Sequence, residues 1–251
     1  MSLTDGYKKQ LAWRDWDTVL DALPSLAAAT VLDLGCGVGD VTELLSRRGA
    51  HVVGVDMNVE LLTAARARRL PRAEFRSADL WTLPPPEDLA GAADGLWCGF
   101  TVAYFTDPAP VVSTWMEHLR PGGWIALIEI DDLFGHEPVT DRTRSLLSTY
   151  ADDALTAGRY DFRIGRRLRP LLEECGCKVE REFDLTDQEL SFDGPATPDV
   201  LEGWRTRLDG MKLLREHCGP EFEWVRADFL GCLIRADHRS FARVQSCIAT
   251  K

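Results

Sequence analysis

The chain has 251 residues, 45% of them hydrophobic, which is enough to bury a core as one substantial domain. Its formal net charge of −11 argues against a nucleic-acid partner, because phosphate binding needs a basic surface. No apolar run approaches the roughly 20 residues that span a bilayer, and the charged N-terminus does not resemble a secretion signal, so we expect a cytoplasmic protein without a membrane partner.

The first half of the chain alternates helices with short apolar strands. A helix is predicted over residues 5–23, and Pro24 stops it. Residues 51–55 are nearly all apolar, which is typical of a parallel strand covered on both faces. The other predicted elements of this half are a strand at 31–34, a helix from Val41 to Gly49, a helix at 59–69, strands at 73–76 and 95–100, a helix from Pro108 and a strand at 124–130.

The alternation continues less regularly in the second half. Its predicted elements are helices at 140–157 and 165–174, a strand at 178–185, helices at 198–217 and 220–235, and a strand at 241–249. Strands that alternate with helices pair in parallel through right-handed crossovers. The sequence therefore predicts an α/β fold with a doubly wound, mostly parallel sheet, as a single domain over residues 1–251.

Three glycines at alternate positions join the first strand to the helix that follows. Gly35, Gly37 and Gly39 allow a sharp turn and let a ligand lie against bare main chain. A dinucleotide-binding fingerprint would place its third glycine at residue 40, which is Asp40 here. Because a carboxylate at a helix start is unfavourable beside a pyrophosphate, the spacing favours a ligand that is neutral or cationic at that point. An NAD-linked oxidoreductase is an alternative, against which Gly39 and Asp40 argue.

Asp33, followed by these glycines, resembles the first motif of the class I methyltransferases that use S-adenosylmethionine. The resemblance covers residues 30–130 and implies S-adenosyl-L-methionine as the cofactor. It also implies a seven-stranded, Rossmann-like sheet whose last two strands form an antiparallel hairpin, here with a long helical insertion. The expected activity is transfer of a methyl group to an oxygen or nitrogen of a small molecule. An alternative is a protein of the same fold that binds the cofactor in a non-methylating or regulatory role.

The resemblance implies a cofactor site beyond the C-terminal ends of the strands, where ligands of open parallel sheets bind. Asp56, after the second strand, is expected to accept hydrogen bonds from both ribose hydroxyls. Asp33 is expected to meet the ammonium group, and Asp79 the exocyclic amine of adenine. The other expected contacts are the backbone of Gly35, Cys36 and Gly37, together with Met57, Leu80, Phe100 and Thr101.

A general base helps the reaction if the acceptor is a hydroxyl or a protonated amine. The candidates are Tyr104, Glu129, Asp131 and His136, with packing, capping or solvated positions as the alternative for each. Glu129 and Asp131 alternate along one strand and face the same way, whereas His136 is expected in the loop that follows. Carboxylates here could hold a divalent cation, but no clear ligand set appears, and no metal is expected. The seven scattered cysteines lack a zinc spacing and are expected to be reduced thiols.

The methyl acceptor is expected to bind beneath helical segments. The helix at 5–23 and the insertions 131–165 and 198–235 are predicted to cover the site as a lid. The alternative is that these helices form a homodimer interface or thicken the core. Candidate substrate contacts, for which core or solvated positions are the alternative, are Tyr7, Trp13, Trp16, Tyr160 and Arg163.

Overall fold

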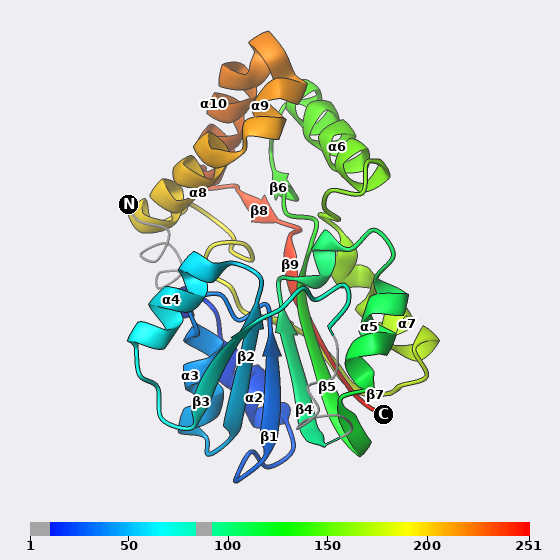
Figure 1. The fold of residues 1–251 in the computed structure, drawn as a ribbon. Helices are drawn as coiled ribbons and strands as arrows, with labels where there is room; N and C mark the ends of the chain where they lie inside the picture. Colours follow the sequence, from blue (N-terminus) through cyan, green and yellow to red (C-terminus); the bar gives the residue numbers. More distant parts are fainter. Residues whose placement is uncertain (1–10, 84–91) are drawn as a thin grey trace.

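The computed structural model describes residues 11–83 and 92–251 and contains a central sheet with helices on both faces (Figure 1). Among the described residues this sheet has seven strands in the order β3-β2-β1-β4-β5-β9-β7, and a separate ladder joins β6 to β8. The strands are β1 (Thr30–Leu34), β2 (His51–Asp56), β3 (Ala73–Ser77), β4 (Ala93–Gly99), β5 (Leu119–Asp131), β6 (His136–Glu137), β7 (Lys178–Leu185), β8 (Arg239–Ser240) and β9 (Arg243–Thr250).

The pairing within the large sheet confirms the predicted fold class. Strands β1 to β5 pair in parallel, and their burial is nearly continuous in β1, β2 and β4, as expected for strands covered on both faces. Strand β9 is antiparallel to both β5 and β7, so the last two strands of the sheet form the predicted hairpin at its edge. The helical insertion lies between β7 and β9 in the chain.

Two apolar cores hold the helices against the sheet. One contains Val19 and Leu20 and packs with the face of the sheet that carries Trp97. The other contains Val111 and Leu172 and covers the opposite face. The helices are α2 (Trp16–Ala22), α3 (Asp40–Arg47), α4 (Val59–Ala67), α5 (Pro108–Met116), α6 (Asp141–Thr156), α7 (Leu168–Glu174), α8 (Pro198–Gly210), α9 (Lys212–Cys218) and α10 (Phe222–Leu233), with the 3₁₀ turns η1 (Val102–Tyr104), η2 (Ile164–Arg167) and η3 (Gly219–Glu221).

The prediction of one continuous helix over 5–23 is wrong within its described part. Helix α2 begins at Trp16, and Asp15 caps it by accepting a hydrogen bond from the backbone N–H of Thr18. Residues 11–13 are also helical, and the helix is interrupted at Arg14 and Asp15, because the backbone N–H of Asp15 and the carbonyl of Trp13 bond to the segment after β7. Long-range pairing therefore overrides local helix propensity at Arg14. Residues 5–10 of this prediction lie outside the described residues.

The predicted helix at 198–217 is two helices. Helix α8 ends at Gly210 and α9 begins at Lys212, with Met211 between them at φ −81° and ψ 73°. This ψ is not helical, and glycine at the preceding position has a low helix propensity. The predicted helix at 220–235 corresponds to η3 and α10.

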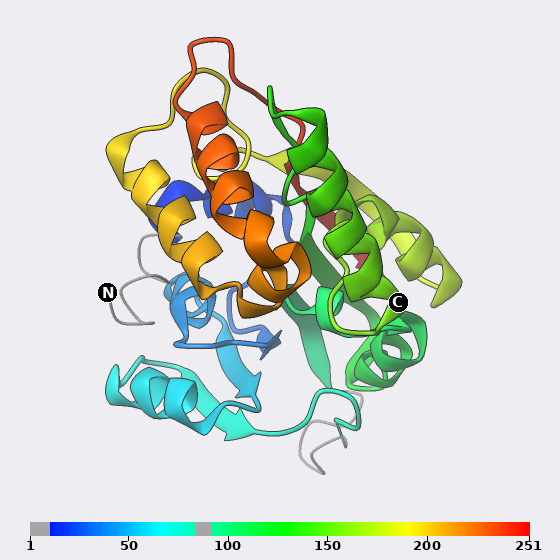
Figure 2. The ribbon, with the colours of Figure 1, turned by 90° about the horizontal axis from the view of Figure 1, so that it is seen from above.

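Helices α6, α8, α9 and α10 form a layer that we call the cap. In Figure 1 the parallel strands point toward the cap, and Figure 2 shows from above that it lies over that end of the molecule. The buried side chains of the cap, Trp204 and Phe229 among them, join the core on one face of the sheet. None of the helices in residues 11–83 and 92–251 has the length and apolar character needed to cross a bilayer.

Candidate cofactor and acceptor site

The glycine loop, residues 35–39, turns tightly between β1 and α3. The backbone N–H groups of Gly35 and Cys36 both donate to the carbonyl of Val55, at 2.8 and 3.1 Å, which anchors the loop to β2. Gly35, Gly37 and Gly39 all have positive φ, at 76°, 54° and 79°. Residues with a side chain rarely adopt this conformation, so the loop requires the alternating glycines.

The three glycines differ in what lies beside them. A Cβ built on Gly35 would stand 2.1 Å from Oγ1 of Thr101, and one on Gly39 would stand 2.8 Å from the ring of Phe75. A Cβ on Gly37 would meet nothing within 4 Å. Gly35 and Gly39 are therefore needed for close packing inside the protein, whereas a Cβ on Gly37 would enter open space although the residue itself is buried.

Asp56 at the end of β2 is joined to the loop at Gly37. Its Oδ2 accepts a hydrogen bond of 2.9 Å from the backbone N–H of Gly37, and its Oδ1 accepts one of 2.8 Å from Asn58. The side chain is only half-buried. Because each carboxylate oxygen has two lone pairs, both oxygens can accept a further hydrogen bond from the hydroxyls of a ligand. Met57 beside it is 72% exposed, an unusual place for a large apolar side chain.

The next strand ends in a second carboxylate on the same edge of the sheet. The backbone N–H of Ala78 donates to the carbonyl of Asp56, so the turn after β3 is attached to the end of β2. Asp79 in this turn is exposed, and its Oδ1 accepts a hydrogen bond from the backbone N–H of Trp81. Leu80 is 8% exposed and belongs to the core on the α5 side.

Phe100 and Thr101 reach the glycine loop from β4. Thr101 lies against Gly35, as the close approach of its Oγ1 shows. Phe100 has a φ of 57°, a conformation that is rare for a bulky residue. The guanidinium of Arg14 lies 4.3 Å above its ring. The structure therefore joins the loop after β1 to the ends of β2 and β4.

Asp33 and Cys36 lie beneath the loop. Asp33 is 2% exposed, and its carboxylate accepts a hydrogen bond of 2.5 Å from Thr42. Burial raises the pKa of Asp33 to about 7. Burial also raises the pKa of the Cys36 thiol, which keeps it protonated. In this arrangement the Asp33 side chain holds β1 to α3, and the expected contact with an ammonium group stays a prediction.

The four candidate bases are not gathered at one point. Glu129 is fully buried, and its Oε1 accepts a hydrogen bond of 3.2 Å from the backbone N–H of Ala103 in η1, while burial raises its pKa to about 8. Oε2 of Glu129 has no hydrogen-bond partner among the described residues. Tyr104 is 59% exposed, and its ring packs edge-on against Tyr160 at 4.9 Å. Glu129 thus supports the turn that carries Tyr104.

Asp131 and His136 lie apart from these two residues. Asp131 forms an ion pair of 2.6 Å with Arg166. His136 belongs to β6 and not to a loop, which corrects the sequence-based expectation. It is 1% exposed, its Nδ1 lies 3.0 Å from Nε2 of His238, and its ring packs edge-on against Trp204. Burial, with His238 and Arg207 nearby, lowers its pKa to about 3.

The candidate substrate contacts divide between the space under the cap and the core. Tyr160 lies between Tyr104 and Phe162, and Trp13 packs against Gly203 of α8. Trp16 is 6% exposed and contacts the rings of Trp97 and Phe100, so it is largely a core residue. Arg163 forms an ion pair of 2.6 Å with Asp152. Tyr7 lies outside the described residues.

Sequence reasoning missed a group of charged residues between the cap and the sheet. Arg14 donates to Asp187 at 2.7 Å, and Arg207 of α8 donates to Glu189 at 2.5 Å. Asp187 and Glu189 are almost fully buried. The partners are 173 and 18 positions apart, so no local pattern joins them. The sequence gives one indication of this group, which is the position of Arg207 three residues after Trp204 on the apolar side of α8.

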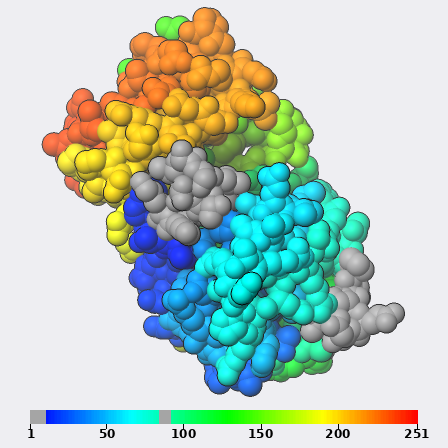
Figure 3. Space-filling model, turned by 60° about the vertical axis from the view of Figure 1, so that its left-hand side comes forward, coloured from blue at the N-terminus to red at the C-terminus, as the bar shows by residue number. Residues whose placement is uncertain are grey.

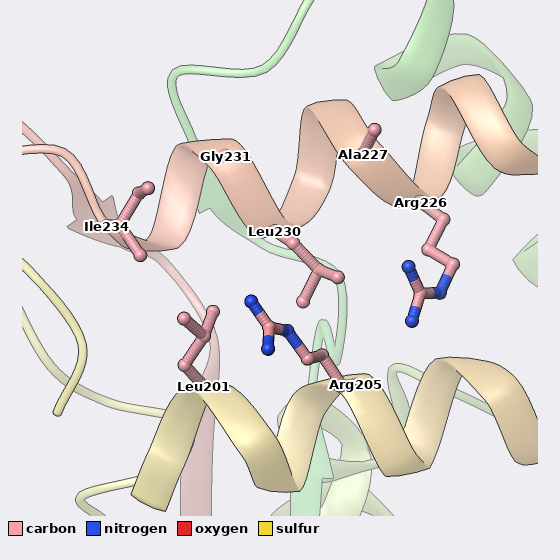
Figure 4. A pocket seen from close by; sticks show the side chains of 7 residues that line it. All are labelled: Leu201, Arg205, Arg226, Ala227, Leu230, Gly231 and Ile234. Atoms are coloured by element: carbon pink, nitrogen blue, oxygen red, sulfur yellow. The ribbon is translucent and has the colours of Figure 1, made fainter. Parts of the chain in front are cut away.

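Two further observations bear on ligands. Within residues 11–83 and 92–251, no three His, Cys, Asp or Glu side chains form a group that could hold a metal ion. A groove of about 470 Å³ lies between α8 and α10 and contains none of the predicted site residues (Figure 4). It is lined by Leu201, Arg205, Arg226, Ala227, Leu230, Gly231 and Ile234.

The residues at the strand ends fit an adenosyl cofactor. Gly37 leaves its backbone open, Asp56 keeps acceptor capacity beside it, and Met57 offers an exposed apolar surface suited to a purine. In the space-filling view of Figure 3, a recess separates the cap from the part of the body that carries α4. Helix α4, which borders this recess, begins three residues after Asp56.

Comparison with known proteins agrees with this fit. Residues 31–123 match the family model described as a methyltransferase domain. A ubiquinone biosynthesis O-methyltransferase from Pseudomonas paraeruginosa is 30% identical over 178 residues, which cover 68% of this chain and 74% of that relative. A trans-aconitate 2-methyltransferase from Azoarcus sp. is 40% identical over 113 residues, 43% of this chain. The chain spans only 42% of the length of that relative.

A solved structure extends the likeness in fold to nearly the whole chain. An S-adenosylmethionine-dependent methyltransferase from Mesorhizobium loti superimposes with a TM-score of 0.54 and 20% identity, over 93% of this chain and 97% of that one. The shared fold, the glycine loop and the likeness over three quarters of a relative lead to one conclusion. The chain belongs to the class I S-adenosylmethionine-dependent methyltransferases, whose cofactor is S-adenosyl-L-methionine.

Proposed function

We propose that the protein transfers a methyl group from S-adenosyl-L-methionine to an oxygen or nitrogen atom of a small molecule. The observation that carries the proposal is the half-buried Asp56 carboxylate hydrogen-bonded to the open backbone of Gly37. Two relatives support the small-molecule part, since their names describe methylation of trans-aconitate and O-methylation in ubiquinone biosynthesis. The net charge of −11 also disfavours a nucleic-acid acceptor.

The proposed cofactor contacts are those at the strand ends. Asp56 accepts hydrogen bonds from the ribose hydroxyls, and the backbone at Gly35 and Gly37 lies against the methionine part. Met57 and Leu80 flank the adenine, with Asp79 at its amine. Phe100 and Thr101 close the site from the β4 side, and Asp33 acts on the ammonium group from beneath the loop.

The cofactor supplies a methyl group on a positively charged sulfur, which is already electrophilic. The protein therefore has to hold a lone pair of the acceptor in line and to exclude water. We assign this to the space between the cap and the strand ends, where Tyr104 and Tyr160 pack against each other. Glu129 positions Tyr104 by holding η1 from below. The proposed lid is the cap together with residues 11–15 of the described chain.

A cytoplasmic location is part of the proposal. All seven cysteines are free thiols, which suits a reducing compartment.

Calorimetric titration with S-adenosylmethionine and S-adenosylhomocysteine tests the cofactor, with NADH as the competing ligand. We expect binding of the first two and none of the third. Transfer of labelled methyl groups to a panel of phenols, carboxylic acids and amines then tests the reaction. Absence of binding would reject the proposal, and binding without transfer to any acceptor would favour the non-methylating alternative.

A further inference from the structure

Arg207 is a partly buried cation on the inner side of the cap. It lies one turn after Gly203, which packs on Trp13, and its guanidinium is 5.4 Å from the ring of Trp204. Its side chain is 22% exposed, whereas that of Arg205 on the same helix is 50% exposed and lines the groove toward α10 (Figure 4). The two arginines of α8 therefore serve different surfaces.

Glu189 fixes the orientation of Arg207. Both Nε and Nη2 of the guanidinium donate to the same oxygen, Oε1 of Glu189, at 3.2 and 2.5 Å. Burial alone would lower the pKa of Arg207, but the Glu189 carboxylate outweighs that effect and raises it, so the guanidinium stays charged. Its third nitrogen, Nη1, donates to no residue among those that the structure describes. One donor edge is thus free for an anion.

The neighbouring charges limit what that anion can be. Arg14 and Arg207 are balanced by Asp187 and Glu189, so this group has no net charge of its own. Arg14 also lies over Phe100, at the proposed cofactor site. With the single positive charge of the cofactor sulfonium nearby, one negative charge on an acceptor is compensated. A doubly charged phosphate would leave a negative charge uncompensated in a site where ions are poorly solvated.

We propose that Arg207, held by Glu189, binds a carboxylate of the methyl acceptor. The inference rests on the proposed function and names the class of acceptor: a small carboxylic acid that presents its methylated atom near Tyr104 and Tyr160. Arginine suits this task because its planar fork matches the geometry of a carboxylate.

The test uses pairs of probes that differ in one charge. Hydroxylated carboxylic acids, 4-hydroxybenzoate among them, are each paired with the uncharged amide, and 4-hydroxyphenyl phosphate represents the dianion. Calorimetry on the complex with a positively charged analogue of S-adenosylmethionine that cannot transfer a methyl group measures binding, because S-adenosylhomocysteine lacks the sulfonium charge. We expect the acids to bind about 10- to 100-fold more tightly than their amides, as charge-assisted hydrogen bonds allow, and more tightly than the phosphate.

The variants separate recognition from folding. Arg207→Gln combined with Glu189→Gln removes both buried charges, since removal of Arg207 alone would leave Glu189 unpaired. We expect this double variant to bind S-adenosylhomocysteine normally and to lose the preference for acids, with a raised KM and little change in kcat for any acid that is methylated. Arg207→Lys should retain part of the preference. Arg205→Gln on the outer side of α8 is the matched control and should behave like the native chain.

Equal binding of acids and amides by the native chain would overturn the inference, and so would an unchanged preference in the double variant. Methyl transfer to neutral acceptors would then leave the proposed function intact. Conversely, an acid preference that depends on Arg207, without transfer to any acceptor, would support this subsite and reject the proposed reaction.

Discussion

The backbone N–H of Gly37 donates a hydrogen bond of 2.9 Å to the carboxylate of Asp56. This contact joins the loop after β1 to the end of β2, and it places an ionisable side chain beside the one glycine of the loop that faces open space. A ligand held by the loop backbone must therefore lie next to Asp56.

Asp56→Ala should weaken the binding of S-adenosylhomocysteine by about 10- to 100-fold, because the ribose would lose charge-assisted hydrogen bonds. Loss of the bonds from Gly37 and Asn58 should lower the free energy of unfolding by only about 1–2 kcal/mol. Calorimetry and urea unfolding measure the two effects. Glu60→Ala, which removes an exposed carboxylate from the first turn of α4, serves as the control. An unchanged dissociation constant for Asp56→Ala would contradict the assignment.

Alanine at two of the loop glycines should give different defects. Gly37→Ala places a methyl group in open space, so it should weaken cofactor binding and cost about 1–2 kcal/mol for the positive φ. Gly35→Ala introduces the same backbone strain and also places its Cβ too close to Thr101. It should therefore lower the free energy of unfolding more. Unfolding and cofactor titration of both variants compare these effects. Partial rescue of Gly35→Ala by Thr101→Ala would identify the clash as the cause.

Glu129 should make the protein less stable as the pH rises. Its pKa is about 8 in the folded protein against an ordinary value of 4.5, so the folded state holds a proton that the unfolded chain has released between these values. The free energy of unfolding should fall from about pH 4.5 to about pH 8. Asp33, with its pKa raised to about 7, acts in the same direction. Urea unfolding at several pH values should show a shallower fall for Glu129→Gln, and an equal slope would count against a buried, protonated Glu129.

His136 should make the protein less stable as the pH falls. Its pKa of about 3 lies below the ordinary 6.5, so the unfolded chain takes up a proton that the folded protein excludes. Stability from this residue is present above pH 6.5 and is lost as the pH falls toward 3. We expect His136→Phe to lessen the loss between pH 6.5 and 4 in thermal unfolding. His51→Phe, at an exposed position, is the control and should not change it.

The sequence predicted the sheet and the cofactor loop because their signals are local. The alternating glycines, Asp56 and Asp79 each follow a strand within a few residues, and the order of parallel strands brings their ends together. The predicted helix boundaries were wrong where backbone from a distant part of the chain pairs with the segment. Arg14 is an example, because it pairs with Asp187 across 173 positions.

The acceptor side could not be predicted in the same way. His136 follows β5 closely in the chain, but its partner His238 is 102 positions away, and their contact draws it into the interior of the cap. Arg207 and Glu189 are likewise joined only by the folded structure. Periodicity indicates which side chains are buried, but it does not show which charged residues meet.

The short ladder between β6 and β8 has a consequence for engineering. It hydrogen-bonds the chain entering α6 to the chain leaving α10, so two insertions that are far apart in the sequence share one seam. A chimera that received only one insertion from a relative would disrupt the pairing of β6 with β8 and the packing of the cap helices on it. Transplanting both insertions together would keep the β6–β8 pairing intact.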